Sequence, residues 1–276
     1  MAGKHKKGFQ KDVGILQTYL HNGIDLEKRR ISFGDVEYST SDFEFASVTI
    51  AIRAIDKMLD LNNQAIEIHM NSYGGDPYQM LALKDKILES SCKFVFYGRG
   101  VIMSAATWIM VVCDERYLSE DAVVMVHNGW VEQCERLTDI QINMKEQKRL
   151  QELLEQIYTD NSFMDKKFWH AVCKRDLFLT SDEVIALGLA DALIVPKKRG
   201  NLRSGLRSNT FNNPTSRKEL RKLVEKLFER VELQVPSNIV VEIKREEFEE
   251  IKPYDRTQEE LEKLGLKDSE DKKEEG

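Results

Sequence analysis

Apolar positions along the first 196 residues follow two different periods. Helical spacing occurs over residues 45–61, 78–88 and 104–113. Short apolar or alternating runs, typical of strands, occupy residues 30–34, 65–70, 93–97 and 123–126. Strands that alternate with helices predict an α/β domain with crossover connections and a largely buried sheet. In such folds, functional sites gather where strands end.

A longer helical pattern follows the predicted sheet. Residues 140–173 carry an apolar stripe set among Lys, Glu and Gln: Ile142, Leu150, Leu153, Leu154, Ile157 and Tyr158. An exposed helix pair would not need so many apolar residues, so we expect this region to pack against a partner. Residues 219–233 predict a further amphipathic helix, and residues 239–243 read as a strand.

Charge is distributed unevenly and marks boundaries near the C-terminus. Residues 197–222 hold nine Lys or Arg against Glu219 alone, and residues 245–276 hold thirteen acidic against seven basic residues. The stretch 197–216 is also rich in turn formers, so we interpret it as a basic linker. It has no interleaved aromatics and no recognised module, so nucleic-acid binding is not expected. We expect the extension at 217–276 to be structured, with a partly disordered acidic tail.

Composition favours a cytoplasmic, globular protein. The chain has 276 residues, of which 41% are hydrophobic, enough for one substantial core. No apolar run approaches the ~20 residues that span a bilayer, and no hydrophobic signal core follows the N-terminus. The four cysteines form no CxxC pair, so buried, reduced thiols are expected instead of a zinc site.

Ser104 is the first residue with candidate chemistry. Gly100 would permit a sharp exit from the preceding strand, and Ala105 would let the next helix pack closely. The hydroxyl would then lie at a helix N-terminus, where the helix dipole favours developing negative charge. The alternative is an ordinary helix N-cap, the commonest role of serine at such a position.

His127 ends the predicted strand 123–126 and precedes Asn128-Gly129, a turn-forming pair. Its imidazole should therefore stand at the rim of the sheet. His69 is its main competitor among the five histidines, although strand alternation would point it into a helix-covered face. A structural role is the alternative for either histidine.

Asp176 lies in the connection before a predicted helix that starts at Thr180 or Ser181. From there it could reach an imidazole and hold its tautomer, or simply form a surface ion pair with Arg175. Gly74-Gly75 follows a strand but matches no phosphate-loop pattern. Backbone amides offered to an oxyanion fit that glycine pair better.

In this order and spacing, the motifs resemble the proteolytic subunit of the caseinolytic protease, ClpP, a family of serine peptidases with the crotonase-like fold. The similarity covers about residues 29–195. It is carried by residues 68–75 (IHMNSYGG), 100–106 (GVIMSAA), 125–127 (MVH), 175–180 (RDLFLT) and 188–191 (GLAD).

The resemblance implies a role for each candidate residue. Ser104 would be the nucleophile, His127 the base and Asp176 the carboxylate that orients the base. Backbone N–H groups of Gly74 and Ala105 would form the oxyanion hole. His127 would take the Ser104 proton, an acyl-enzyme would form, and water activated by the same histidine would release it. No cofactor and no metal are implied.

The resemblance also implies an architecture. The family fold has repeated ββα units with a protruding handle of helix and strand, and here a C-terminal extension is added. We expect a peptidase domain at 29–196 between an N-terminal segment at 1–28 and the basic linker at 197–216. The family forms homo-oligomeric, heptameric rings, stacked as a chamber that degrades unfolded polypeptides. An AAA+ unfoldase would supply them, and ATP would act only through that separate partner.

Residues beside the expected site differ from the family pattern and leave alternatives open. Tyr73 replaces a proline, Ile102 and Met103 replace two alanines, and Asn128 replaces a glutamine. One alternative is an inactive assembly subunit that pairs with an active paralogue. Another, suggested by the extension, is a viral or procapsid-type maturation peptidase. A crotonase-like hydratase is a third, but a Ser, His and Asp at these spacings argue against it.

Overall fold

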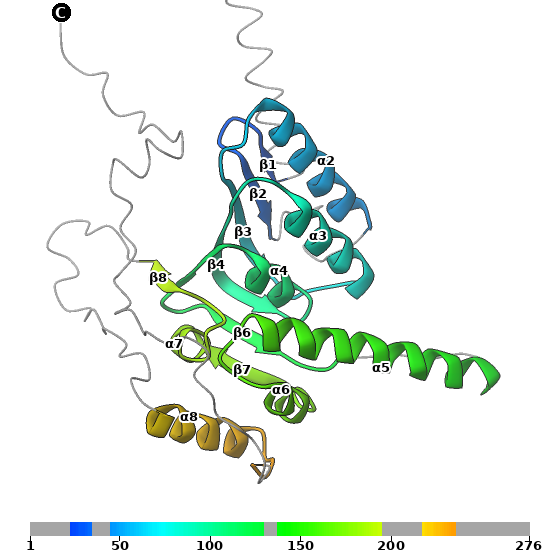
Figure 1. The fold of residues 1–276 in the computed structure, drawn as a ribbon, viewed down its shortest axis with the longest axis vertical. Coiled ribbons are helices and arrows are strands. Elements are labelled where there is room, and N and C mark those ends of the chain that lie inside the picture. Colours follow the sequence, from blue (N-terminus) through cyan, green and yellow to red (C-terminus); the bar gives the residue numbers. More distant parts are fainter. Residues whose placement is uncertain (1–22, 35–44, 130–136, 195–216, 236–276) are drawn as a thin grey trace, which may run out of the picture.

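The computed structural model describes residues 23–34, 45–129, 137–194 and 217–235. Within these ranges the chain forms a mixed α/β structure built on one mixed sheet of eight strands (Figure 1). The strand predicted at 239–243, the linker at 197–216 and the acidic tail lie outside the described residues.

The sheet has strand order β1-β2-β3-β4-β5-β8, and β6 and β7 extend it from β4. All pairs are parallel except β1 with β2 and β6 with β7. The strands are β1 Ile24–Asp25, β2 Arg30–Phe33, β3 Ile66–Ser72, β4 Phe94–Met103, β5 Glu115–Ser119, β6 Val123–Val126, β7 Leu177–Thr180 and β8 Ala192–Ile194.

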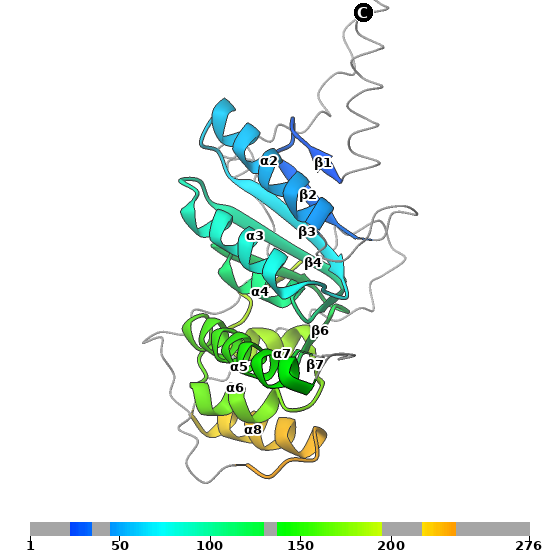
Figure 2. The ribbon, with the colours of Figure 1, turned by 90° about the vertical axis from the view of Figure 1, so that its right-hand side faces the viewer.

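Three helices cover one face of this sheet: α2 Phe45–Leu61, α3 Pro77–Glu89 and α4 Ala106–Val112 (Figures 1 and 2). The covered face is apolar because alternate strand residues point into it, as Ile66, Ile68 and Met70 do in β3. The remaining helices are α5 Leu137–Asp160, α6 Lys166–Val172, α7 Ser181–Ala186 and α8 Arg217–Arg230.

Helix α5 extends well beyond the body of the molecule (Figure 1). Its C-terminal half packs on the core through Leu150, Leu154 and Tyr158, whereas Ile142 and Met144 in the other half are exposed. Of the apolar stripe predicted from the sequence, Leu150, Leu154 and Tyr158 are buried, Leu153 and Ile157 are partly buried, and Ile142 is exposed.

Strand β4 continues past the point where the sequence predicted its exit. Gly100 lies inside β4 with φ +68°, and a Cβ there would come within 2.4 Å of Asn71 Oδ1. The same oxygen accepts a hydrogen bond from Val101 N at 3.0 Å. Gly100 therefore bends β4 instead of ending it, and the strand leaves β5 at Gly98 to pair with β6 from Val101 onward. The predicted exit at Gly100 is wrong.

Most other predicted elements are confirmed, including the helix at 45–61 and the strand at 123–126. The helix predicted from Ser104 instead begins at Ala106. Cys92, Cys113 and Cys173 are free and buried, as expected, and Cys134 lies outside the described residues. Within the described part of the chain, no helix has the length and apolar character needed to cross a membrane.

Candidate active site

The pairing of β6 with β7 brings His127 and Asp176 together. The two strands are antiparallel, and Val126 faces Leu177. His127 directly follows Val126 and Asp176 directly precedes Leu177, so both side chains leave the same end of this strand pair. Next to these two residues, Asn128 N donates a hydrogen bond to Cys173 O at 2.7 Å, which links the segment after β6 to the segment before β7.

Ser104 occupies the tight turn between β4 and α4. Its φ is +53°, an unusual conformation for a residue with a Cβ and one that costs about 1–3 kcal/mol. Ser104 N donates to Met125 O at 2.9 Å, which ties the turn to β6. The N-cap of α4 is Ala105 and no side chain caps the helix, so the interpretation of Ser104 as a helix cap is wrong.

The three predicted side chains form a continuous chain of contacts. His127 Nε2 lies 2.8 Å from Ser104 Oγ, and His127 Nδ1 lies 3.3 Å from Asp176 Oδ1. In the neutral tautomer that fits both contacts, Nδ1–H points to the carboxylate and Nε2 accepts from the hydroxyl. The His127 side chain is 18% exposed and that of Asp176 is 62% exposed. A base is thus shielded beside a hydroxyl, with a carboxylate on its far nitrogen.

Gly74 lies against the Ser104 turn. Its φ is +107°, and an added Cβ would come within 2.8 Å of both Met103 O and Ser104 Cβ and 3.1 Å of Ala105 N. Only a residue without a side chain fits this close approach. Gly74 N donates to the buried Ser72 Oγ at 3.1 Å, so an oxyanion would have to share or replace that bond.

Two buried hydroxyl groups that no sequence motif indicated, those of Thr107 and Tyr158, stabilise the Ser104 turn. Thr107 Oγ1 donates to Ser104 O at 2.6 Å and also contacts Tyr158 Oη of α5 at 2.5 Å. Tyr158 is fully buried, which raises the pKa of its phenol, and its ring packs on Trp169 of α6. Thr107 follows the motif closely, but its partner is 51 residues away, a pairing that local sequence does not reveal.

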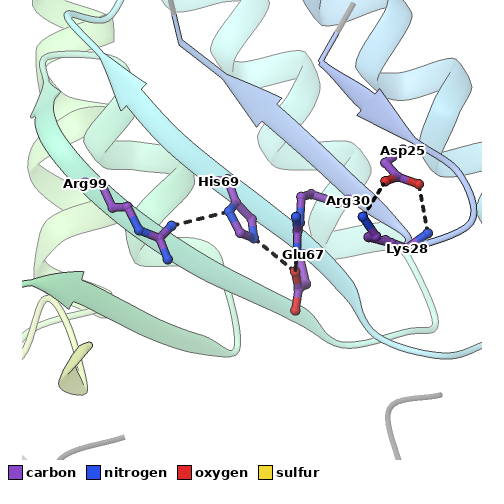
Figure 3. Close-up of polar contacts among 6 residues, drawn as sticks. All are labelled: Asp25, Lys28, Arg30, Glu67, His69 and Arg99. Carbon is purple, nitrogen blue, oxygen red and sulfur yellow. Dashed lines mark hydrogen bonds and ion pairs between the residues drawn. The ribbon is translucent and has the colours of Figure 1, made fainter. Parts of the chain in front are cut away.

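His69 has a different environment from His127. It lies on the face of the sheet opposite the helices, so the expectation of a helix-covered position is wrong. Its Nε2 is 2.9 Å from Glu67 Oε2, and its Nδ1 is 3.3 Å from Arg99 Nη1 (Figure 3). Arg30 Nε and Nη2 donate to the same oxygen, Glu67 Oε2, at 3.1 and 3.0 Å. Within the described ranges, no group of three or more His, Cys, Asp or Glu residues is arranged to hold a metal ion.

Comparison with known proteins shows which proteins this chain is similar to. The family model described as Clp protease matches residues 44–197, a range that contains Ser104, His127 and Asp176. The ATP-dependent Clp protease proteolytic subunit of Borrelia garinii is 26% identical over 136 residues, 49% of this chain and 70% of that protein. The corresponding subunit of Deinococcus radiodurans is 25% identical over 141 residues, 50% of this chain and 69% of that protein.

Proposed function

The chain belongs to the Clp protease family, and on that basis we propose that it is a serine endopeptidase that cleaves unfolded polypeptides through an acyl-enzyme on Ser104. The observation that carries this proposal is the contact chain from Ser104 through His127 to Asp176. Nucleophile, base and orienting carboxylate are what acyl transfer requires, in that order.

Each of the three residues then has one role. His127 Nε2 removes the Ser104 proton as Oγ attacks the scissile carbonyl, and it later returns a proton to the leaving amine. Asp176 holds the imidazole by its Nδ1–H and stabilises the imidazolium that forms. The same histidine then activates water, which releases the acyl group from Ser104.

The oxyanion of the tetrahedral intermediate is held by the backbone N–H groups of Gly74 and Ala105. The close approach of Gly74 to the Ser104 turn supports this assignment. The bond from Gly74 N to Ser72 Oγ keeps the amide oriented before substrate arrives, and the stronger, charged acceptor then competes for it. Each such donor contributes about 2.7–4 kcal/mol to the transition state.

The proposed assembly and organisation follow the family. Residues 29–196 form the peptidase domain, and α5 serves as the handle through which heptameric rings stack into a cytoplasmic chamber. The exposed Ile142 and Met144 on the projecting half of α5 support a packing role there. An AAA+ unfoldase feeds the chamber, so ATP is consumed by that partner.

An inactive assembly subunit is the second candidate, because bulky residues replace small ones before Ser104. The buried position of Ile102 weakens this alternative: its side chain is 0% exposed and belongs to the core, so its bulk does not enter the site.

The proposal is tested by measuring hydrolysis of a fluorescently labelled unfolded polypeptide. The mass of the protein particle in solution is measured first, to establish the oligomeric state of the sample. We expect Ser104→Ala and His127→Ala to lower kcat by at least about 10⁴-fold, as removal of a triad member does. Ser91→Ala serves as the control, because Ser91 is exposed and bonds to Asn63, far from the site in sequence. An assembled wild-type ring no more active than Ser104→Ala would establish the inactive subunit instead.

A further inference from the structure

Helix α8 lies outside the family match, which ends at residue 197, yet it is firmly packed on the domain. Its apolar face is buried through Leu220, Val224, Leu227 and Phe228. Phe228 meets Phe168 of α6 edge to face, with ring centroids 5.9 Å apart. Figures 1 and 2 both show α8 lying next to α6. The predicted helix at 219–233 is thus part of the folded body.

The last residue of α8, Arg230, reaches across to β7 and α7. Its Nη1 donates to the backbone oxygen of Phe178 at 2.7 Å and to Glu183 Oε2 at 2.9 Å. Its Nη2 donates to Glu183 Oε1 at 2.5 Å. This two-pronged geometry is the strong form of an arginine–carboxylate pair. The Glu183 side chain is only 7% exposed, and burial by itself would raise the pKa of its carboxyl, but the hydrogen bonds it accepts, chiefly from Arg230, lower that pKa below its usual value.

Glu183 is itself fixed to the other end of β7. It forms a capping box with Thr180, in which Glu183 N donates to Thr180 Oγ1 and Thr180 N donates to Glu183 Oε2. Arg230 therefore hydrogen-bonds to β7 directly at Phe178 and is connected to Thr180 through Glu183. In the described part of the chain β7 pairs only with β6, so its other edge has no strand partner. The arginine satisfies a carbonyl on this short strand.

Asp176 depends on β7 for its position. It is two residues from Phe178, and its side chain is 62% exposed, so burial does not hold it against His127. The strand register that aligns Val126 with Leu177 sets the separation of His127 and Asp176. A displacement of β7 would therefore change the 3.3 Å distance between His127 Nδ1 and Asp176 Oδ1.

We propose that Arg230 is a positioning residue that holds β7 in register, so that the functional unit of this chain extends beyond the family domain to include α8. The catalytic part of this inference rests on the proposed function. The C-terminal extension would then have a defined role, because helix α8 holds the strand that positions Asp176.

The test compares Arg230→Leu and Arg230→Lys with Arg221→Leu in the full-length chain. Arg221 is the matched control, because it lies on the same helix, is 77% exposed and pairs only weakly with Glu225 at 3.5 Å. Leucine removes both contacts of Arg230, whereas lysine keeps the charge and can reach one acceptor at a time. If Arg230→Leu does not fold, Arg230→Lys decides the question.

Two readouts are measured together: kcat and KM for polypeptide hydrolysis, and amide hydrogen exchange of residues 177–180. For Arg230→Leu we expect kcat to fall about 10- to 100-fold with KM within about twofold, since a displacement near 1 Å can cost about 10²-fold. Exchange at residues 177–180 should accelerate in the same variant. Arg230→Lys should fall between it and wild type, and Arg221→Leu should match wild type.

The inference is overturned if exchange at residues 177–180 is unchanged in the Arg230 variants, or if it accelerates while kcat remains at the wild-type value. A fall in kcat without faster exchange also overturns it, because the effect would not pass through β7. Should wild type and Ser104→Ala prove equally inactive, the proposed function fails, and exchange alone still decides whether Arg230 holds β7.

Discussion

Replacing Gly74 with alanine probes the geometry of the site most sharply. The new methyl group would lie 2.8 Å from Met103 O and 2.8 Å from Ser104 Cβ, distances that real Cβ atoms essentially never show. Neither neighbour is the end of a flexible side chain, so the Gly74 loop itself must move. The φ of +107° adds strain for any residue with a Cβ, about 1–3 kcal/mol.

The two effects should appear in different measurements. Unfolding in urea should show a loss of about 1–3 kcal/mol in the free energy of unfolding, from the backbone strain. Peptide hydrolysis should show kcat lower by about 10²- to 10³-fold, because the displaced Gly74 amide no longer meets the oxyanion. KM should change little, since that donor acts mainly in the transition state.

Gly34→Ala provides the matched control. A Cβ at Gly34 would meet Asn71 O at 3.5 Å, an ordinary van der Waals contact, and its backbone is not in the left-handed region. We expect that variant to keep wild-type kcat. If Gly74→Ala loses stability as expected yet retains kcat within about threefold, Gly74 does not supply an oxyanion donor. Unchanged stability would show that the close approach to Ser104 is wrong.

Two further predictions concern the framework of the domain. Asp191→Asn should lower the free energy of unfolding by about 3 kcal/mol, because Arg116, whose side chain is 7% exposed, loses the carboxylate it binds at 2.7 and 3.0 Å. Asp60→Asn is the control, because Asp60 belongs to an exposed ion pair with Lys57 at 3.6 Å. In the same denaturation assay it should cost under about 0.5 kcal/mol. Burial lowers the pKa of His69 below its usual 6.5, so the unfolded chain binds more protons just below that pH and stability falls as the solution is acidified from pH 7.5 to 5.5. His69→Gln should flatten that part of the stability curve, and an identical slope in both proteins would contradict the assignment.

The fold class was predictable from the sequence because most elements are long or strongly patterned. The helix at 45–61 and the strand at 123–126 have clear periods, and both are confirmed. Strand β7 was overlooked although Leu177 and Leu179 are buried and Phe178 is exposed, a pattern of period two. The sequence predicted a loop at these four residues because a strong helix-capping signal follows them. They form a strand because they pair with β6, and local sequence does not reveal that pairing.

The site shows the same division between local and long-range information. Ser104, His127 and Asp176 could be chosen because motif order and spacing limit the options, and the structure brings them together. The supports of the site could not be chosen, because Tyr158 and Arg230 lie far along the chain from the groups they contact. Such contacts depend on how α5 and α8 pack, which no local pattern specifies.

The course of β4 is a further example. Gly100 was correctly identified as a residue with a special backbone role, but its function is to bend a continuing strand around Asn71. The distinction decides where Ser104 lies, because the strand must reach β6 before the turn begins. A glycine in a strand permits both outcomes, and the tertiary partner selects one.

The measurement that tests the central claim most directly is the site of covalent labelling by a fluorophosphonate. Assembled wild-type protein is treated with the reagent, digested and mapped by mass spectrometry, with Ser104→Ala treated in parallel. We predict one adduct, on the peptide that contains Ser104, formed only when His127 is present to activate the hydroxyl. An assembled ring that forms no adduct, or one that is modified at another residue while Ser104 stays free, would contradict the proposed peptidase.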